Sequence, residues 1–399
     1  MKIKNNFFSD ITLNIIAAGL VAVISQFVVY PLLGKELSTE YFGELLIMMS
    51  VVNIVAILLG NSLNNIRLIY NSEYINEKVS GDFSVLLLLA LVLNVVLVSA
   101  ITFGLWPDKP LMNNLILVVV SVFTMLRSYL GVEYRLNLNY KKILMHSVVY
   151  STALSLGTLI LFLTEIWPLI FLVGELTSFI YLYFTTNLLK ERFSTTYKFK
   201  RTLKQYSLLS LSSLIGNVLL YLDRIIIFPF LGAHSVAVFF AATVIGKMSS
   251  FIISPISGVI LSYLSNKTTK MSLKKFNLIN LLMLFLSFLI AISTSFISSP
   301  LLKILYPNVY LETLEILLLA NLAVILQISS SIPQTILLKY SSSSFQVVIQ
   351  VIYGITYITG GIFLIGEAGL KGFCIAAILA ALIKYLTLIV IGTRTLNRK

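Results

Sequence analysis

The feature that most constrains this chain is a nearly unbroken succession of apolar stretches, each about twenty residues long and separated by short polar breaks. A bilayer's hydrocarbon core is about 30 Å thick, and an α-helix needs roughly 20 apolar residues to cross it. Only 11% of the 399 residues are charged, whereas a soluble domain averages about 25%. Because the chain lacks the charge to cover a water-facing surface, we expect an all-α membrane protein.

We expect about twelve transmembrane helices in two six-helix bundles, an N-terminal lobe of residues 1–195 and a C-terminal lobe of residues 196–399. The apolar stretches leave little length for a separate soluble domain. The predicted spans are Ile11–Leu33, Phe42–Leu63, Phe83–Trp106, Leu111–Gly131, Ile143–Thr164, Pro168–Leu189, Gln205–Leu231, Val238–Leu264, Asn277–Ile297, Glu312–Ile336, Phe345–Ile365 and Gly372–Gly392.

The distribution of Lys and Arg predicts the orientation. Of the 29 cations, 21 lie in connections on one side of the predicted membrane and 4 on the other, and the remaining 4 lie inside spans. Cytoplasmic connections carry the excess of Lys and Arg. The side with 21 cations is therefore predicted to be cytoplasmic, and an even number of helices places both termini there. This bias also explains the net charge of +13 without a nucleic-acid partner.

The most basic connection, Lys190–Lys204, lies at the middle of the chain between the two sets of six helices. We interpret it as a solvated linker that sets the topology and is attracted to anionic lipid. A dedicated site for a partner protein is the alternative.

One short sequence motif recurs in both halves. Val28–Gly34 (VVYPLLG) and Ile226–Gly232 (IIFPFLG) are 198 residues apart, and each ends the first helix of its half. Six spans per half make both halves enter the membrane in the same direction. The pattern predicts parallel repeats related by a pseudo-two-fold axis along the membrane normal, a plan found in transporters with a site between the halves.

The sequence contains no motif of soluble catalysis. No GxxxxGK[ST] loop is present, so ATP is not expected to be hydrolysed by this chain, and no His/Cys cluster has metal-binding spacing. We therefore predict no enzyme activity, no metal and no cofactor. His234 is interpreted as part of an ordinary turn, and the single cysteine, Cys374, as an apolar packing residue.

Ionisable residues inside the spans are the strongest functional signal. Asp223, Arg224, Lys247 and Lys384 would together cost roughly 10–14 kcal/mol to insert, at about 2.5–3.5 kcal/mol each. They must face partners or an aqueous cavity, and intramembrane charges are functional candidates by default. With Glu175 included, three cations against two acids leave an excess of positive charge, which favours an anionic cargo.

Helical spacing supports such a cavity. Residues three and four apart share a helix face, which groups Ser213 and Asn217 with Arg224 in helix seven. In helix eight the same spacing groups Lys247 with Ser250 and Ser254, and Pro255 predicts a kink. Lys384 lies among Ala377, Ala380 and Ala381, small residues that permit close helix approach.

A purely structural interpretation of these charges stays open. Asp223 and Arg224 are sequence neighbours and cannot face each other on a helix, so each needs another partner. Asp223 could pair with Lys247, and Glu175 with Lys384. Arg127, near the cytoplasmic end of helix four, is expected to extend its guanidinium to the membrane surface.

The chain resembles a known family of transporters. Two six-helix halves, with the segments Tyr30–Met49 and Tyr221–Ile245, are similar to the multidrug/oligosaccharidyl-lipid/polysaccharide (MOP) transporter superfamily, and within it to the polysaccharide-transporter branch of Wzx-type flippases. Asp223 matches a recurrent acidic position of that family, and Arg67, in NNIRLIY, a recurrent basic position near the cytoplasmic mouth.

The resemblance implies a flippase that moves undecaprenyl-pyrophosphate-linked oligosaccharide repeat units of O-antigen or capsule across the bacterial cytoplasmic membrane. Its partners would be the lipid-linked oligosaccharide, membrane lipids and possible polymerase and chain-length machinery. Asp223 is the candidate for coupling to a proton or sodium gradient. The candidate cargo-binding residues are Arg67, Ser213, Asn217, Arg224, Lys247 and Lys384.

Three other functions fit the sequence less well. An ion-coupled multidrug exporter of the same superfamily would prefer acidic residues in its cavity, and this chain has more bases there. A lipid II flippase typically has two further helices. A polysaccharide polymerase or ligase usually carries a large external loop, whereas the longest outer loop here is about Ser298–Leu311.

Overall fold

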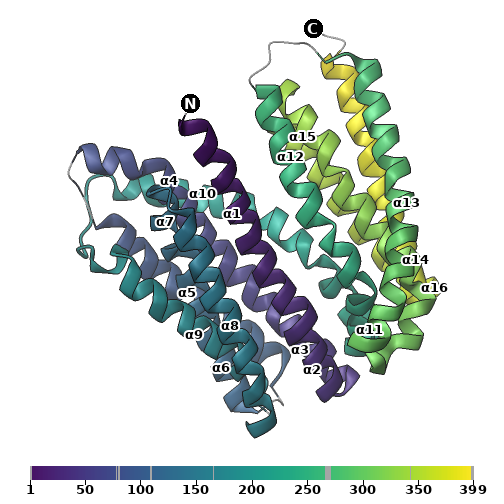
Figure 1. Cartoon of the computed structure of the whole chain (residues 1–399), viewed down its shortest axis with the longest axis horizontal. Helices are drawn as coiled ribbons and strands as arrows, with labels where there is room; N and C mark the ends of the chain where they lie inside the picture. Colours follow the sequence, from purple (N-terminus) through teal and green to yellow (C-terminus); the bar gives the residue numbers. More distant parts are fainter. Residues whose placement is uncertain are drawn as a thin grey trace. The chain divides into compact units, whose positions relative to one another are not determined.

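The computed structural model describes residues 2–77, 79, 81–107, 110–164, 166–265, 271–341 and 343–396. Nearly all of these residues are helical, and the described part of the chain contains no strand (Figure 1). The all-α fold expected from the apolar stretches is confirmed. The helices form two compact units, which we describe separately. The first unit comprises residues 1–33 and 47–221, and the second comprises residues 34–46 and 222–399.

In the first unit, α1 packs on α8, α8 on α9, α9 on α6, and α6 on α4 and α5. Two π-helical turns, η1 and η2, interrupt the first two spans. The helices that lie wholly or partly in this unit are α1 (Lys2–Ile24), η1 (Ser25–Val29), α2 (Tyr30–Glu36), α3 (Thr39–Val52), η2 (Asn53–Ile57), α4 (Leu58–Asn76), α5 (Asp82–Leu105), α6 (Leu111–Leu130), α7 (Val132–Leu136), α8 (Tyr140–Thr164), α9 (Pro168–Thr185), η3 (Leu188–Lys190) and α10 (Phe199–Leu220).

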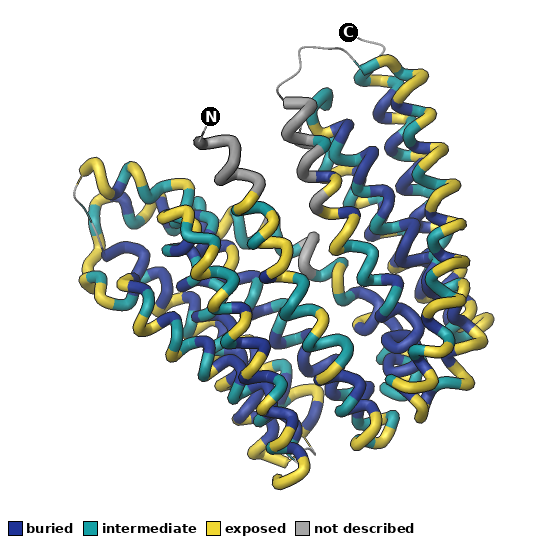
Figure 2. The backbone as a smooth tube through the Cα atoms, viewed as in Figure 1, coloured by how far each residue is buried: buried dark blue, intermediate teal, exposed yellow. Residues whose placement is uncertain are grey.

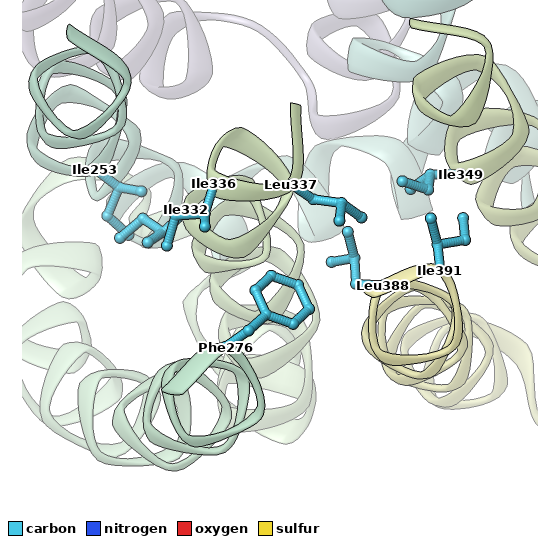
Figure 3. Close-up of a cluster of buried hydrophobic side chains, with 8 residues drawn as sticks. All are labelled: Ile253, Phe276, Ile332, Ile336, Leu337, Ile349, Leu388 and Ile391. Carbon is cyan, nitrogen blue, oxygen red and sulfur yellow. The ribbon is translucent and has the colours of Figure 1, made fainter. Parts of the chain in front are cut away.

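In the second unit, α14 is central and packs against α11, α13 and α16. A cluster of buried apolar side chains joins α12, α13, α15 and both ends of α16, and the Phe276 ring of α13 belongs to it (Figure 3). The helices that lie wholly in this unit are α11 (Leu222–Met248), α12 (Ser250–Ser265), α13 (Leu273–Leu305), η4 (Pro307–Val309), α14 (Tyr310–Ser329), α15 (Ser331–Tyr340) and α16 (Ser343–Leu396).

The surface of both units is that of a multi-pass membrane protein. Large apolar side chains are exposed along α5, for example Val92 and Val96, and along α13, for example Leu281 and Phe285. Figure 2 shows exposed residues following the outer helices while buried residues gather inside each bundle. Such continuous apolar faces are favourable against lipid and not against water.

Among the described residues, ten helical segments are long and apolar enough to cross a membrane. Two of them, Leu222–Ser254 and Phe345–Leu396, fold back on themselves. In a straight helix the 24-residue separation of Asp223 and Lys247 would place them about 36 Å apart, yet their side chains are 2.7 Å apart. Gly232 (φ 76°, ψ 178°) breaks the first helix and Gly369 (φ 56°) the second. The break at Gly369 divides Phe345–Leu396 into two spans. The first arm of α11, residues 222–231, is too short to cross a membrane alone, so the twelfth span needs α10, which is not among the ten segments.

The predicted spans differ from the observed helices in the seventh and eighth spans. The seventh, predicted as one helix, is broken at Tyr221 between α10 and α11. The eighth is interrupted at Ser249, between α11 and α12, and not at Pro255, which lies inside α12. The first compact unit continues to Tyr221, because α10 packs against α4 and α5.

Candidate functional site

The candidate site is built on the hairpin of α11 in the second unit. Because the chain reverses at Gly232, Asp223 on the first arm faces Lys247 on the second, and the Lys247 Nζ lies 2.7 Å from Asp223 Oδ2. Asp223 also accepts a hydrogen bond from the Arg224 backbone N–H at 3.0 Å and is only 6% exposed. The structure thus supplies the ion pair that the structural interpretation of these charges required.

Arg224 also contacts α3 and the second arm of α11. Its Nη1 donates a 2.8 Å hydrogen bond to the backbone carbonyl of Leu46, and its guanidinium carbon lies 5.1 Å from the centre of the Phe240 ring. A cation above an aromatic face is stabilised by the ring's quadrupole. The side chain is therefore buried at the junction of α11 and α3, where carbonyl and ring offset part of its desolvation.

Lys384 is the buried cation with the weakest compensation. It lies on the second arm of α16, is 5% exposed, and has its Nζ 5.4 Å from the centre of the Tyr353 ring on the first arm. In the described part of the chain no carboxylate lies within ion-pair distance of it. The suggested partner, Glu175, instead pairs with Arg127 in the first unit. A buried ammonium without a counter-ion is costly, so an anionic ligand would relieve it.

The charge balance of the second unit follows from these positions. Among its described residues the buried or half-buried acids are Asp223 and Glu44, and the buried or half-buried cations are Arg224, Lys247, Lys339 and Lys384. Two acids against four cations leave an excess of positive charge, as expected from the sequence.

The predicted polar face of helix seven is not one continuous helical surface. Ser213 lies on α10 in the first unit, whereas Arg224 lies on α11 in the second, with the break at Tyr221 between them. The side chain of Asn217 lies outside the described residues. The spacing argument assumed an unbroken helix, and the break removes that premise.

Arg67 is engaged within the first unit. Its guanidinium forms two hydrogen bonds with the Glu191 carboxylate, at 2.8 and 2.5 Å, and lies 4.4 Å from the Phe83 ring centre. Its side chain is 11% exposed. A bidentate pair of this kind is geometrically specific and strong, so Arg67 can contact a cargo only if Glu191 releases it.

Sequence reasoning missed a buried polar network in the first unit. Arg127 donates to Glu175 through Nε at 2.7 Å and Nη2 at 2.9 Å, and Tyr150 donates to the same carboxylate at 3.1 Å. The expectation that Arg127 extends to the membrane surface is therefore wrong. The available signal was Glu175 itself, because a carboxylate within a span requires a cation.

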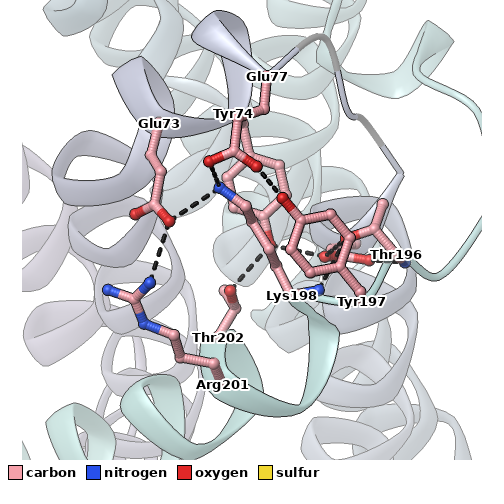
Figure 4. Close-up of polar contacts among 9 residues, drawn as sticks. Glu73, Tyr74, Glu77, Thr196, Tyr197, Lys198, Arg201 and Thr202 are labelled. Atoms are coloured by element: carbon pink, nitrogen blue, oxygen red, sulfur yellow. Dashed lines mark hydrogen bonds and ion pairs between the residues drawn. The ribbon is translucent and has the colours of Figure 1, made fainter.

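The mid-chain linker is exposed along much of its length but is docked at Thr196 and Lys198 (Figure 4). Lys198 Nζ lies 2.8 Å from Glu73 and 2.5 Å from Glu77, at the end of α4. Thr196 donates to Asp82 through both its backbone N–H and its hydroxyl, each at 2.6 Å. Together with the Arg67–Glu191 pair, these contacts fasten the segment before α10 to α4 and α5.

The charge of Lys198 is stable in this setting. Burial lowers the pKa of its ammonium, but hydrogen bonds with Glu73 and Glu77 raise it, and the net pKa lies above the ordinary value. A raised lysine pKa means that its contribution to stability is complete below about pH 10.4 and is lost only as the pH rises through the folded value. The Lys198 contacts therefore persist throughout the physiological pH range.

No protein-family model and no curated protein matches the chain. Solved structures do match its fold. The lipid II flippase MurJ in an inward closed conformation is similar with a TM-score of 0.66 and 16% identity, over 97% of this chain and 86% of that one.

An inward-facing multidrug resistance MATE family transporter of the MOP superfamily is similar with a TM-score of 0.65 and 12% identity, over 97% of this chain and 95% of that one. The Vibrio cholerae MATE transporter VcmN in its bent form has a TM-score of 0.56 and 12% identity, over 99% and 97%. The chain thus has the fold shared by these flippase and multidrug transporter structures.

Proposed function

We propose that this chain translocates undecaprenyl-pyrophosphate-linked oligosaccharide repeat units from the inner to the outer leaflet of the bacterial cytoplasmic membrane by alternating access. The observation that carries the proposal is Lys384, a buried cation in a unit whose buried charge is net positive. The likeness in fold to a lipid II flippase supports a lipid-linked cargo.

The chemistry of the cargo fits these charges. A diphosphate entering the protein must be desolvated, and hydrogen bonds to an ionised partner are about twice as strong as neutral ones. Within the second unit Lys384 and Arg224 would bind the diphosphate, and Ser213 of the first unit is a separate candidate for contact with a sugar hydroxyl. Arg67 would meet the headgroup at the cytoplasmic mouth after leaving Glu191. The lipid tail stays in the bilayer.

The driving force would come from the membrane. Moving a negative headgroup outward through an inside-negative potential is favourable by about 2.3 kcal/mol per charge per 100 mV. Coupling to a proton or sodium gradient would act at Asp223, the buried carboxylate of the second unit. Because Lys247 already neutralises it, an incoming cation would have to displace the Lys247 ammonium. Polymerase and chain-length proteins would take up the product outside.

A multidrug exporter is the second candidate, because MATE transporters share the fold with a similar TM-score. Organic cations would need an available buried carboxylate. Asp223 is held by Lys247 and Glu175 by Arg127. The buried Asp82 accepts hydrogen bonds from Tyr74 and Thr196, so each of these three acids is already engaged. The excess of cations favours the anionic cargo.

The test is flipping in vesicles that contain the purified protein and an undecaprenyl-diphosphate-linked oligosaccharide. The readout is the fraction of oligosaccharide that an impermeant glycosidase can cleave. Lys384→Met should slow flipping at least about tenfold, because losing a hydrogen bond to a charged group costs about 1.5–3 kcal/mol. Lys303→Met, which removes an exposed lysine from the last turn of α13, should flip at the wild-type rate.

Two outcomes would contradict the proposal at different levels. Wild-type vesicles that flip no faster than protein-free vesicles, while ethidium crosses them readily, would favour the exporter. A wild-type rate for Lys384→Met would retain the flippase but remove Lys384 from its cargo site.

A further inference from the structure

A short segment from the N-terminal half belongs to the second unit. The chain leaves the first unit after Leu33, contributes Gly34–Leu46 to the second, and returns at Ile47. This segment contains the connection between the first two spans, which the charge distribution places on the outer side of the membrane. We refer to Gly34–Leu46 as the outer segment.

The outer segment is closely packed against the second unit. The Phe42 ring contacts those of Phe240 and Tyr306, with centroids 5.9 and 6.1 Å apart. The Asn308 amide donates to the Gly34 carbonyl at 3.0 Å. A Cβ at Gly43 would lie only 1.8 Å from the Ala233 carbonyl oxygen, so the backbones themselves are in contact there.

His234 stands between two carboxylates at the edge of this packing. Its Nδ1 lies 3.4 Å from Glu40 Oε1 on the outer segment, and its Nε2 lies 2.7 Å from Glu312 Oε2 on α14. A neutral imidazole carries one N–H and can donate to one carboxylate only, whereas an imidazolium donates from both nitrogens. Two facing carboxylates therefore fit the protonated ring.

We propose that His234 is a pH-sensitive latch whose imidazolium ties the outer segment to α14 by bridging Glu40 and Glu312. The inference rests on the alternating-access part of the proposed function, in which the attachment of the outer segment to α14 would change during the transport cycle. The His234 side chain is 36% exposed and the carboxylates more so, so the ring equilibrates with the medium.

The charged groups around the latch set its direction. Beyond Glu40 and Glu312, the neighbouring elements carry Lys35 and Glu36 on α2, and the Lys371–Glu315 pair, at 2.9 Å, on α16 and α14. Glu315 is paired with Lys371. The carboxylates in contact with the His234 ring are those of Glu40 and Glu312. Protonation therefore strengthens attachment, and deprotonation removes the Glu40 bridge. Imidazoles change charge between about pH 5 and 8.

The experiment measures attachment directly and needs no cargo. Spin labels at Lys35→Cys and Leu311→Cys, in a Cys374→Ala background, report the distance between the outer segment and α14 in nanodiscs. Lowering the pH from 8 to 5.5 should raise the ratio of the short-distance to the long-distance population about two- to fivefold, the range expected of exposed ion pairs.

The chain offers a matched control because it contains only two histidines. His234→Gln should abolish the pH dependence. His146→Gln, which removes the histidine that bonds to Ser178 in the first unit, should preserve it. Identical distance distributions at both pH values in the wild type, or a pH dependence that survives His234→Gln, would overturn the latch. Neither result bears on which cargo is carried.

Discussion

The buried charged side chains of this membrane protein differ in whether a counter-ion neutralises them. Asp223 is neutralised by Lys247 and Glu175 by Arg127, whereas Lys384 has an aromatic ring as its nearest described compensation. Breaking a buried pair is destabilising because it leaves one charge without a counter-ion. The size of the effect depends on which partner remains and on how well water can reach it.

This inequality predicts an asymmetric response at the Asp223–Lys247 pair. Lys247→Met should destabilise the protein by roughly 2 kcal/mol or more, since it leaves an 8%-exposed carboxylate without its ammonium. Asp223→Asn should cost less, about 1 kcal/mol, because the Lys247 side chain is 34% exposed and can be hydrated. The double variant should be close to the wild type.

Thermal unfolding of the four proteins in one detergent provides the measurement, and the coupling energy of the double-mutant cycle provides the test. Additive single effects would show that the two side chains do not interact in the membrane.

Breaks in two long helices bring the charged residues of the second unit opposite their partners. The hairpin at Gly232 brings Asp223 opposite Lys247, and the hairpin at Gly369 brings Lys384 opposite Tyr353. Both breaks need a backbone conformation with positive φ, which a residue with a Cβ adopts only at a cost.

Gly232→Ala should therefore destabilise the protein by about 1–3 kcal/mol and weaken the ion pair across the hairpin. No atom lies within 4 Å of the added Cβ, so the cost is that of backbone strain alone. Gly19→Ala is the matched control. Its Cβ also meets nothing within 4 Å, but Gly19 lies inside α1, where alanine should stabilise by about 0.5–1 kcal/mol. If both variants changed the unfolding temperature in the same direction, the interpretation of Gly232 as a strained position would be contradicted.

At the scale of the whole molecule, the orientation in the membrane remains a prediction from the 21-to-4 distribution of cations. The ion pairs of Lys198 with Glu73 and Glu77 require the end of α4 and the start of α10 to lie on the same side of the membrane.

Single cysteines in the Cys374→Ala background test the orientation. Arg192→Cys and Lys371→Cys both occupy exposed positions. In intact cells a membrane-impermeant maleimide should label Lys371→Cys, and it should label Arg192→Cys only after the membrane is opened. Labelling of Arg192→Cys in intact cells would reverse the predicted topology and would place the His234 latch inside the cell.

The all-α membrane class, about twelve spans and the excess of cations inside the spans follow from the amino-acid sequence alone. Apolar length and charge counts are local properties, and a bilayer imposes the same requirement on every span. The ion pair of Asp223 with Lys247 was one of the alternatives that the sequence left open. Only the tertiary structure decided between them, because the pairing depends on where α11 reverses.

The same reason explains what the sequence analysis missed. The Arg127–Glu175 pair, the docked linker and the outer segment all join residues that are far apart along the chain. Their partners are selected by how helices pack, and helical periodicity gives the face of a residue but not the element opposite it. His234, assigned from the sequence to an ordinary turn, acquires its two carboxylates only when α3 and α14 meet α11.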